Sequence, residues 1–166
     1  SSHNTSGAAE ALEEEKKKEI EEMTAEIHEQ LEVSQLSNVV SVQQNGDQLI
    51  ITVDGQTLFE SGDAELSWQA DFIFEELIKM FQFYYEFSIN IKGHTDNIPI
   101  RTVKFPSNWE LSAIRATTVL RYFLDQNITP QRMTATGYAD SVPIAPNDTE
   151  DNRALNRRVE FVLEKN

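Results

Sequence analysis

A strand–loop–helix stretch that runs from residue 91 to residue 115 contains an anion and a cation that could act together on one ligand. Asp96 follows directly after the expected strand, and Arg115 lies two turns into the expected helix. The join between these elements can bring both side chains to the same end of the fold. An arginine can grip a carboxylate with two hydrogen bonds, and an aspartate can accept from an ammonium group. The pair therefore suits a ligand that is itself a zwitterion.

The helix that carries Arg115 is predicted to begin at a capping box, in which Ser107 and Glu110 satisfy the first backbone amides. At about 100° per residue, Asn108 and Ser112 share one polar face with Arg115. Alone, a helix arginine is more often a solvated surface residue, but these neighbours favour a binding role. The adjacent face is predicted to be core: Trp109, Ala113, Ala116, Leu120 and Phe123.

His94-Thr95-Asp96 could also belong to a metal site or a catalytic triad. A metal site needs three or four ligands, and the other two histidines, His3 and His28, lie near the N-terminus. A triad needs a placed nucleophile, and the sequence has no Gly-x-Ser-x-Gly elbow. We therefore expect no metal and no other cofactor, and we predict that His94 packs or hydrogen-bonds to hold the loop.

Composition excludes several classes of protein. The chain has 166 residues, enough for one domain and an extra element, and its net charge of −14 argues against a nucleic-acid partner. The absence of cysteine excludes disulfides, thiolate metal sites and a cysteine nucleophile. No apolar run approaches the ~18–20 residues of a membrane span, and no signal peptide is visible. Because the chain does not begin with methionine, we expect a fragment or a processed form.

The N-terminal region differs from the rest in composition. Residues 1–7 are small and polar and are expected to be disordered, whereas residues 8–33 predict an acidic helix. A narrow apolar stripe, Ile20, Met23, Ile27 and Leu31, is expected to rest weakly on the domain, and residues 8–19 are expected to fray. The helix is either a solvated end or a stalk leading to a membrane anchor. We divide the chain into a helical linker, 1–35, and a domain, 36–166.

The order of the strands and helices expected in the domain predicts an α+β fold, a mixed sheet with helices packed on one face. A hairpin is expected at 38–44 and 48–54, joined at Asn45-Gly46-Asp47. Leu58 and Phe59 are expected to fold onto the core. The remaining expected strands are 87–93, 133–138 and 157–163, and the remaining helices are 68–85, capped by Ser67, the helix beginning at Ser107, and a turn at 151–156.

Two further groups of residues allow more than one interpretation. The aromatic residues of helix 68–85 are too many for one stripe, so this helix is either well buried or has a flank that meets a partner; they are Trp68, Phe72, Phe74, Phe81 and Phe83. Arg157 and Arg158 begin the last strand. They either border the ligand site or form ion pairs that tie the strand to the acidic loop before it.

Five short pieces, in this order, resemble the OmpA-like peptidoglycan-binding domain: Gly93-His94-Thr95-Asp96, Asn108, Leu111-Ser112 with Arg115-Ala116, Gly137, and Asn156-Arg157-Arg158-Val159-Glu160. Two features resemble more particularly the MotB branch of that family, the flagellar stator subunits. They are the sequence from Phe105 to Ser112 and the long insertion between Asp96 and Asn108. The resemblance covers roughly residues 40–164.

The resemblance implies that Asp96 and Arg115 hold diaminopimelate, a stem residue of peptidoglycan that carries an ammonium and a carboxylate on one carbon. It extends the candidate ligand-binding set to Thr95, Asn108, Leu111, Ser112 and Arg158. We expect Asp96 and Arg115 to be exposed, so that replacing either one changes stability by no more than about 0.5 kcal/mol.

The resemblance also implies a role for the whole protein. It implies a non-enzymatic, homodimeric wall anchor in the periplasm, part of an inner-membrane protein that pairs with a MotA-like channel subunit. The alternatives are a Pal- or OmpA-type anchor unrelated to a motor, or a wall-active hydrolase that would need a second carboxylate near Asp96.

Overall fold

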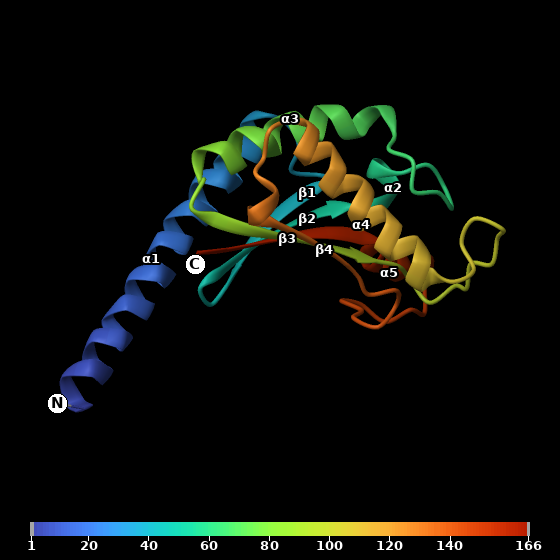
Figure 1. Ribbon diagram of the computed structural model, residues 1–166. Helices are drawn as coiled ribbons and strands as arrows, with labels where there is room; N and C mark the ends of the chain where they lie inside the picture. The colour runs from blue at the N-terminus through green and yellow to red at the C-terminus, as the bar shows by residue number, and fades with distance from the viewer. Residues whose placement is uncertain (1, 166) are drawn as a thin grey trace.

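The computed structural model describes residues 2–165, and its centre is one five-stranded sheet in the order β1-β2-β5-β3-β4 (Figure 1). The strands are β1 (Val40–Asn45), β2 (Gln48–Asp54), β3 (Phe87–His94), β4 (Met133–Gly137) and β5 (Arg158–Lys165). Only β3 and β4 run parallel; the other neighbours are antiparallel. The helices are α1 (Ser2–Val33), α2 (Gly55–Leu58), α3 (Trp68–Phe83), α4 (Asn108–Asp125) and α5 (Glu150–Asn156), with a 3-10 turn at Pro130–Arg132.

Helices α3 and α4 cover one face of the sheet, as Figure 1 shows, and the core lies between these two layers. Phe123 of α4 lies at the centre of an aromatic cluster, with ring centroids 5.1 Å from Phe74, 5.3 Å from Phe81 and 5.6 Å from Phe161 of β5. Strand β3 alternates between buried and half-buried side chains along most of its length. The predicted α+β architecture, a mixed sheet with helices on one face, is confirmed.

The hairpin is also confirmed. Asn45 pairs with Gln48, so Gly46 and Asp47 form the turn. Gly46 has a φ of 63°, the left-handed conformation that glycine adopts without strain. Leu58 and Phe59 are buried, as expected, but Leu58 is the last residue of a short helix, α2, that we did not predict.

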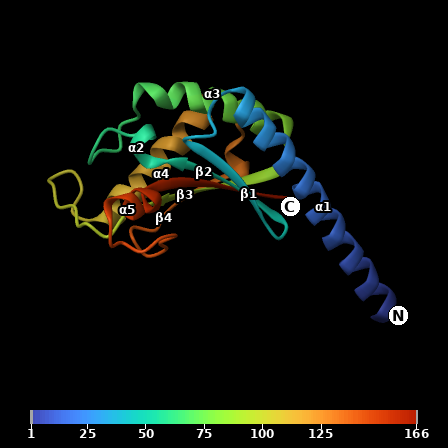
Figure 2. The same ribbon diagram turned by 180° about the vertical axis from the view of Figure 1, so that it is seen from behind.

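Helix α1 differs from our expectation at both of its halves. It begins at Ser2, so the helical hydrogen bonding extends through residues that we expected to be disordered; Ser1 lies outside the described residues. Figure 2 shows the first half pointing away from the domain. The second half contacts β1 and β2, and no residue of the stripe is more than 2% exposed: Ile20, Met23, Ile27 and Leu31. The expected weak docking is therefore wrong, whereas the division at residues 35 and 36 stays a prediction.

Helix α3 has a buried side and an exposed aromatic flank. Phe74 and Phe81 are fully buried, but Trp68 is 82% exposed, Phe72 56% and Phe83 73%. Ser67 occupies the N-cap position without capping, because its hydroxyl donates to the carbonyl of Thr57 at 2.5 Å instead. The predicted cap is thus wrong, although the helix begins where expected.

Helix α4 is rotated relative to the predicted burial pattern. Trp109 is 55% exposed and Ala113 is exposed, whereas Ser112, expected on the polar face, is 1% exposed. The capping box itself is confirmed: Ser107 Oγ accepts from the amide of Trp109 at 3.2 Å and contacts the Glu110 carboxylate. Across residues 2–165, no helix is both long and apolar enough to cross a membrane.

Candidate ligand-binding site

Two glycines explain how α4 comes to lie directly on the sheet. A Cβ added to Gly93 would lie 2.4 Å from the carbonyl oxygen of Ser112, and one added to Gly137 would lie 2.4 Å from the amide nitrogen of Ala113. Such distances leave no room for a side chain, so β3 and β4 meet α4 backbone to backbone. This close approach brings Asp96, just after β3, to the same end of the fold as Arg115, one turn beyond Ser112.

A third glycine closes the opposite wall of the site. The amide of Gly55 donates to the carbonyl of Arg157 at 2.9 Å, and a Cβ on Gly55 would lie only 2.9 Å from that same oxygen. The contact joins the end of β2 to the beginning of β5. Between these walls lies a pocket of about 370 Å³, called here the Arg115 pocket, which is lined by Gly55, Gln56, Phe59, Ser61, Gly62, Arg115, Glu150 and Arg157.

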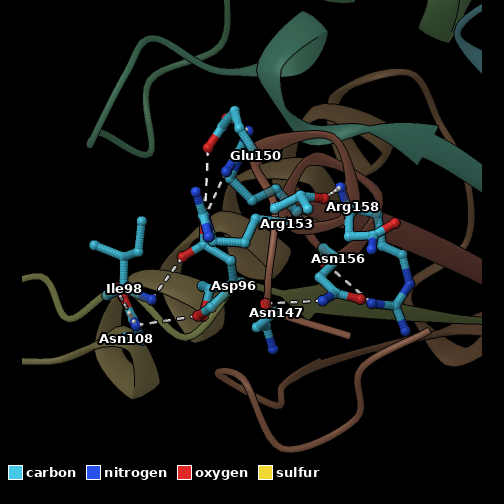
Figure 3. Close-up of polar contacts among 12 residues, drawn as sticks. Asp96, Ile98, Asn108, Asn147, Glu150, Arg153, Asn156 and Arg158 are labelled. Atoms are coloured by element: carbon cyan, nitrogen blue, oxygen red, sulfur yellow. Dashed lines mark hydrogen bonds and ion pairs between the residues drawn. The ribbon is translucent and has the colours of Figure 1, made fainter. Parts of the chain in front are cut away.

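Asp96 is held firmly at the edge of this site (Figure 3). Its Oδ1 accepts from the amide of Ile98 at 2.9 Å, and its Oδ2 accepts from Arg157 Nη1 at 2.6 Å. The residue is only 7% exposed. The expectation of an exposed Asp96 was wrong, because the loop after β3 folds back over its own carboxylate.

Arg157 bridges two carboxylates. Besides Asp96, it donates through Nη2 to Glu150 Oε1 at 2.6 Å. Burial lowers the pKa of Arg157, but the hydrogen bonds to Asp96 and Glu150 outweigh it and raise that pKa above its usual value. The hydrogen bond from Arg157 in turn lowers the pKa of Glu150. The bridge therefore favours the charged forms of Arg157 and Glu150.

Arg115 is the cation of the pocket that keeps donors available. Its Nε donates to the carbonyl of Asp63 at 2.7 Å, and its guanidinium lies 4.8 Å from the ring centroid of Phe59. Burial lowers the pKa of Arg115 to about 10, so the group is still charged at neutral pH. Within the described part of the chain, its two terminal nitrogens have no hydrogen-bond acceptor. They can therefore receive the carboxylate of a ligand.

Two other predicted site residues shape the loop that carries Asp96. Thr95 donates from its hydroxyl to the carbonyl of Asp96 at 2.8 Å and from its amide to the carbonyl of Ala139 at 2.8 Å. Asn108 donates to the carbonyl of Ile98 at 3.0 Å (Figure 3). Both lie beside Asp96, but neither lines the Arg115 pocket, so their contact with a ligand stays a prediction.

Leu111 and Ser112 do not present their side chains to a ligand. Leu111 is 5% exposed and packs in a small cluster with Ala64 and Phe105. Ser112 uses its hydroxyl to accept from the amide of Ala139 at 2.9 Å and to donate to the carbonyl of Trp109 at 3.1 Å. Both side chains are used within the fold and neither lines the Arg115 pocket, so their contact with a ligand stays a prediction.

Arg158 was also predicted at the site, but it lies on the other face of β5. It donates to the carbonyls of Asn156 and Val142, at 3.0 and 2.9 Å, and its Nε lies 3.3 Å from Glu160 Oε2 (Figure 3). Successive strand residues point to opposite sides, so only one arginine of the pair can reach Asp96. That residue is Arg157, whereas Arg158 ties β5 to the preceding loop.

His94 behaves as predicted. Its Nε2 lies 2.6 Å from Glu160 Oε1, and its ring stacks on Tyr138 with centroids 5.2 Å apart. Glu160 lies on β5 and Tyr138 directly follows β4, so His94 ties the end of β3 to both neighbouring strands. In the region the structure describes, no group of three or more His, Cys, Asp or Glu residues could hold a metal ion.

Sequence reasoning missed part of the pocket. Phe59 was expected only in the core, and Ser61 and Gly62 were not singled out, although all three line the Arg115 pocket. The arginine pair after Asn156 did carry a usable signal. Val159, Phe161 and Leu163 point into the core, so the same alternation assigns Arg157 to the α-helical side, where Asp96 and Arg115 lie.

Comparison with known proteins identifies the family of this chain. The pattern of the OmpA family matches residues 58–157. Motility protein B of Bacillus subtilis is 28% identical over 146 residues, 87% of this chain and 56% of the relative. The chain spans about half the length of the curated relatives it matches first.

Solved structures show the same fold. A MotB-like protein from Desulfovibrio vulgaris superposes with a TM-score of 0.90 at 37% identity, covering 93% of this chain and 96% of that one. The cell wall anchor of the T6SS from Pseudomonas aeruginosa follows with a TM-score of 0.75 at 30% identity, covering 82% of this chain and 94% of that one. Because the family pattern matches residues 58–157, more than half of the chain, the chain belongs to the OmpA family.

Proposed function

We propose that this chain anchors a protein to the cell wall by binding peptidoglycan non-covalently, and that the Arg115 pocket takes the zwitterionic end of a diaminopimelate stem residue. The observation that carries this proposal is the charged Arg115 guanidinium, whose terminal nitrogens lack an acceptor in residues 2–165, facing a pocket of about 370 Å³. A guanidinium of this kind can bind a carboxylate through two hydrogen bonds.

The ammonium group of the same ligand needs an anion nearby. Glu150 lines the pocket and its side chain is 62% exposed, while Asp96 lies behind it, paired with Arg157. A carboxylate oxygen has two lone pairs, so an oxygen that accepts from Arg157 can accept from a second donor. Arg115 would hold the carboxylate of the ligand, and Glu150 and Asp96 would hold its ammonium.

The same arrangement favours binding over hydrolysis. A glycosidase needs one carboxyl group that stays protonated to act as a general acid. Arg157 donates to both Asp96 and Glu150, and its hydrogen bond lowers the pKa of Glu150. The lowered pKa keeps Glu150 in its ionised form near neutral pH, which is unsuited to proton donation.

We further propose that the whole protein is a MotB-like stator subunit, with this domain in the periplasm and a MotA-like channel subunit as partner of its membrane segment. The support is the similarity to Motility protein B over 87% of this chain. A wall anchor outside the motor is the second candidate, favoured by the similarity to the cell wall anchor of the T6SS. Joining residues 1–166 to the membrane segment of Bacillus subtilis Motility protein B, in a strain lacking that protein, tests the choice. Restored swimming supports the motor, and paralysis despite wall binding supports the second candidate.

Binding itself is tested by co-sedimentation with purified sacculi that contain diaminopimelate. Arg115→Ala should reduce binding by roughly 2–5 kcal/mol, the loss typical of one partner of a buried charge contact. Arg115→Lys should recover little of the lost binding, because an ammonium cannot form the paired hydrogen bonds of a guanidinium. Arg121→Ala, on the exposed surface of the same helix, is the matched control. Unchanged retention of Arg115→Ala would contradict the assignment of the pocket.

A further inference from the structure

A second pocket, of about 270 Å³, begins at the residue next to Asp96. It is lined along the loop that leads to α4 and at Ala139 and Asp140, and it shares no lining residue with the Arg115 pocket. Trp109 lies on its wall, so we call it the Trp109 pocket. The segment around Asp96 thus separates two recesses, one of which the proposed function leaves without a role.

Trp109 is an exposed aromatic residue on a fixed backbone. Its amide donates to Ser107 Oγ at 3.2 Å, and its carbonyl accepts from Ser112 Oγ at 3.1 Å. Its side chain is nevertheless 55% exposed, in the first turn of α4. Pro99 and Pro106 line the same pocket and restrict the loop around it. More than half of a large aromatic side chain is therefore presented to solvent beside this pocket.

The polar side chains around this surface are a mixed set. Asn97 offers an amide donor and acceptor, and Asn108 offers its amide oxygen, because its nitrogen donates to the carbonyls of Asp96 and Ile98. Arg101 and Asp140 have opposite charges, so the pocket has no net formal charge. This neutrality contrasts with the chain as a whole, whose net charge is −14. The pocket thus combines the indole ring of Trp109 with neutral amides and one pair of opposite charges. This combination fits an uncharged ligand that has one apolar face and hydroxyl and amide groups around its edge.

We propose that the Trp109 pocket binds an N-acetylated amino-sugar ring of the glycan strand, stacked on the indole of Trp109. The inference rests on the proposed function, because the sugar is the part of peptidoglycan to which the stem peptide is attached. Asn108 connects the two recesses: it lines the Trp109 pocket and donates to the carbonyl of Ile98, within the loop that carries Asp96. One muropeptide can then place its peptide at Arg115 and its sugar at Trp109.

Three probes separate the two subsites by isothermal titration: a disaccharide that carries a diaminopimelate-containing tripeptide, the free tripeptide, and a tetramer of N-acetylglucosamine. Trp109→Ala should weaken binding of the disaccharide–peptide on the order of tenfold, the loss expected for one aromatic contact, and should leave the free tripeptide unaffected. Trp109→Phe should keep most of the affinity. Arg115→Ala should weaken binding of both peptide-containing probes.

Fluorescence gives a second readout. Trp68→Phe leaves Trp109 as the only tryptophan of the chain, and Trp68 lies on α3, outside both pockets. The tetramer of N-acetylglucosamine should then change the emission of Trp109 in a saturable manner.

The outcomes distinguish this inference from the proposed function. If Trp109→Ala binds the disaccharide–peptide as the wild type does, the sugar subsite is wrong while the Arg115 pocket stands. The subsite is also wrong if Trp109→Ala loses affinity for the free tripeptide to the same extent, because Trp109 would then act through the loop. If the wild type binds none of the three probes, the proposed function itself fails, and the sugar subsite with it.

Discussion

Asp96 and Arg157, which are 61 residues apart in the chain, form an ion pair with 2.6 Å between Oδ2 and Nη1. The pair joins the loop after β3 to the residue that precedes β5. Both side chains are largely enclosed, at 10% and 16% exposure. The anion that we assign to ligand binding is therefore also a structural link, and its replacement affects the fold as well as the ligand.

Asp96→Ala is predicted to lower both stability and wall binding. The substitution leaves the amide of Ile98 and one side of Arg157 without a partner, although Glu150 still pairs with that arginine. We expect the free energy of unfolding to fall by about 2 kcal/mol, which is less than the full cost of breaking a buried ion pair. This value replaces the stability change of at most about 0.5 kcal/mol that was expected from the sequence on the assumption of an exposed side chain. Urea unfolding measures the change, and Asp125→Ala, on the exposed end of α4, is the control. Equal stability of the two variants would contradict the structural role.

Glu160 is predicted to make stability depend on pH in the acid range. Burial raises the pKa of Glu160, but hydrogen bonds and charge from His94 and Arg158 lower it below its usual value. The stability gained from this carboxylate is thus fully present above the unfolded pKa, about 4.3, and is lost as the pH falls through the lower folded pKa. Lys92, opposite Glu160 in the β3–β5 ladder, adds a further cation on the neighbouring strand.

Glu160→Gln tests this dependence. The difference in free energy of unfolding between wild type and Glu160→Gln should be largest above about pH 5 and should shrink as the pH is lowered toward 3. Glu164→Gln, an exposed position on the same strand, should show no such convergence. A difference that is constant from pH 7 to pH 3 would mean that Glu160 does not contribute through its charge.

The exposed flank of α3 is predicted to join two copies of the chain. Trp68 and Phe72 line a pocket of about 250 Å³ together with Leu36 and Val39. Such large exposed aromatic side chains are typical of interfaces. The other expected contact surface, the stripe from Ile20 to Leu31, is buried within the chain itself and is not available.

Light scattering at several concentrations decides whether the chain dimerises. Phe72→Glu should shift a dimer to the monomer. Ile114→Glu, an equally drastic change at an exposed position of α4, should not. A wild type that stays monomeric at high micromolar concentration would exclude the α3 flank as a self-association surface.

The elements that follow from hydrophobic period and turn chemistry were predictable from the sequence. The alternation of Phe87, Ile89 and Ile91 predicted β3, and the glycine of the 45–47 turn predicted the hairpin. The site was predictable as far as the charges of Asp96 and Arg115. These inferences use local patterns, which a single sequence contains.

The remainder depends on contacts between distant segments. The rotation of α4 is fixed by the backbone contacts of Ser112 and Ala113 with Gly93 and Gly137, which expose Trp109 and bury Ser112. The burial of Asp96 requires Arg157, 61 residues later. The alternation of β5 places Arg157 on the side of Asp96 but does not identify its partner, and the rotation of α4 leaves no mark in the periodicity of that helix, so Trp109 was expected on the wrong face.

The last prediction concerns α1, whose two halves have different surroundings. From residue 6 to residue 15 every side chain is exposed, and Leu12 is 54% exposed. From residue 6 onward, the first tertiary hydrogen bond along the helix is from Gln44 Nε2 to the carbonyl of Lys17, at 3.0 Å, and Lys165 then pairs with Glu19 at 3.1 Å. Farther on, Tyr84 donates to Glu26, and Ser34 donates to Glu76 at 3.2 Å.

Hydrogen exchange should reflect this division. We expect fast exchange before Lys17, clear protection from Ile20 to Leu31, and the slowest exchange at Ile89 and Ile91 in β3. Two substitutions test the same division by their effect on stability. Ile27→Ala should lower the free energy of unfolding by about 2–5 kcal/mol, because it removes buried methyl groups from the main core, whereas Leu12→Ala should leave it almost unchanged. Core-like protection from residue 6 onward, or equal effects of the two substitutions, would mean that α1 is one rigid element. Fast exchange confined to the first half would instead leave that half free to move while the buried stripe keeps the second half on the sheet.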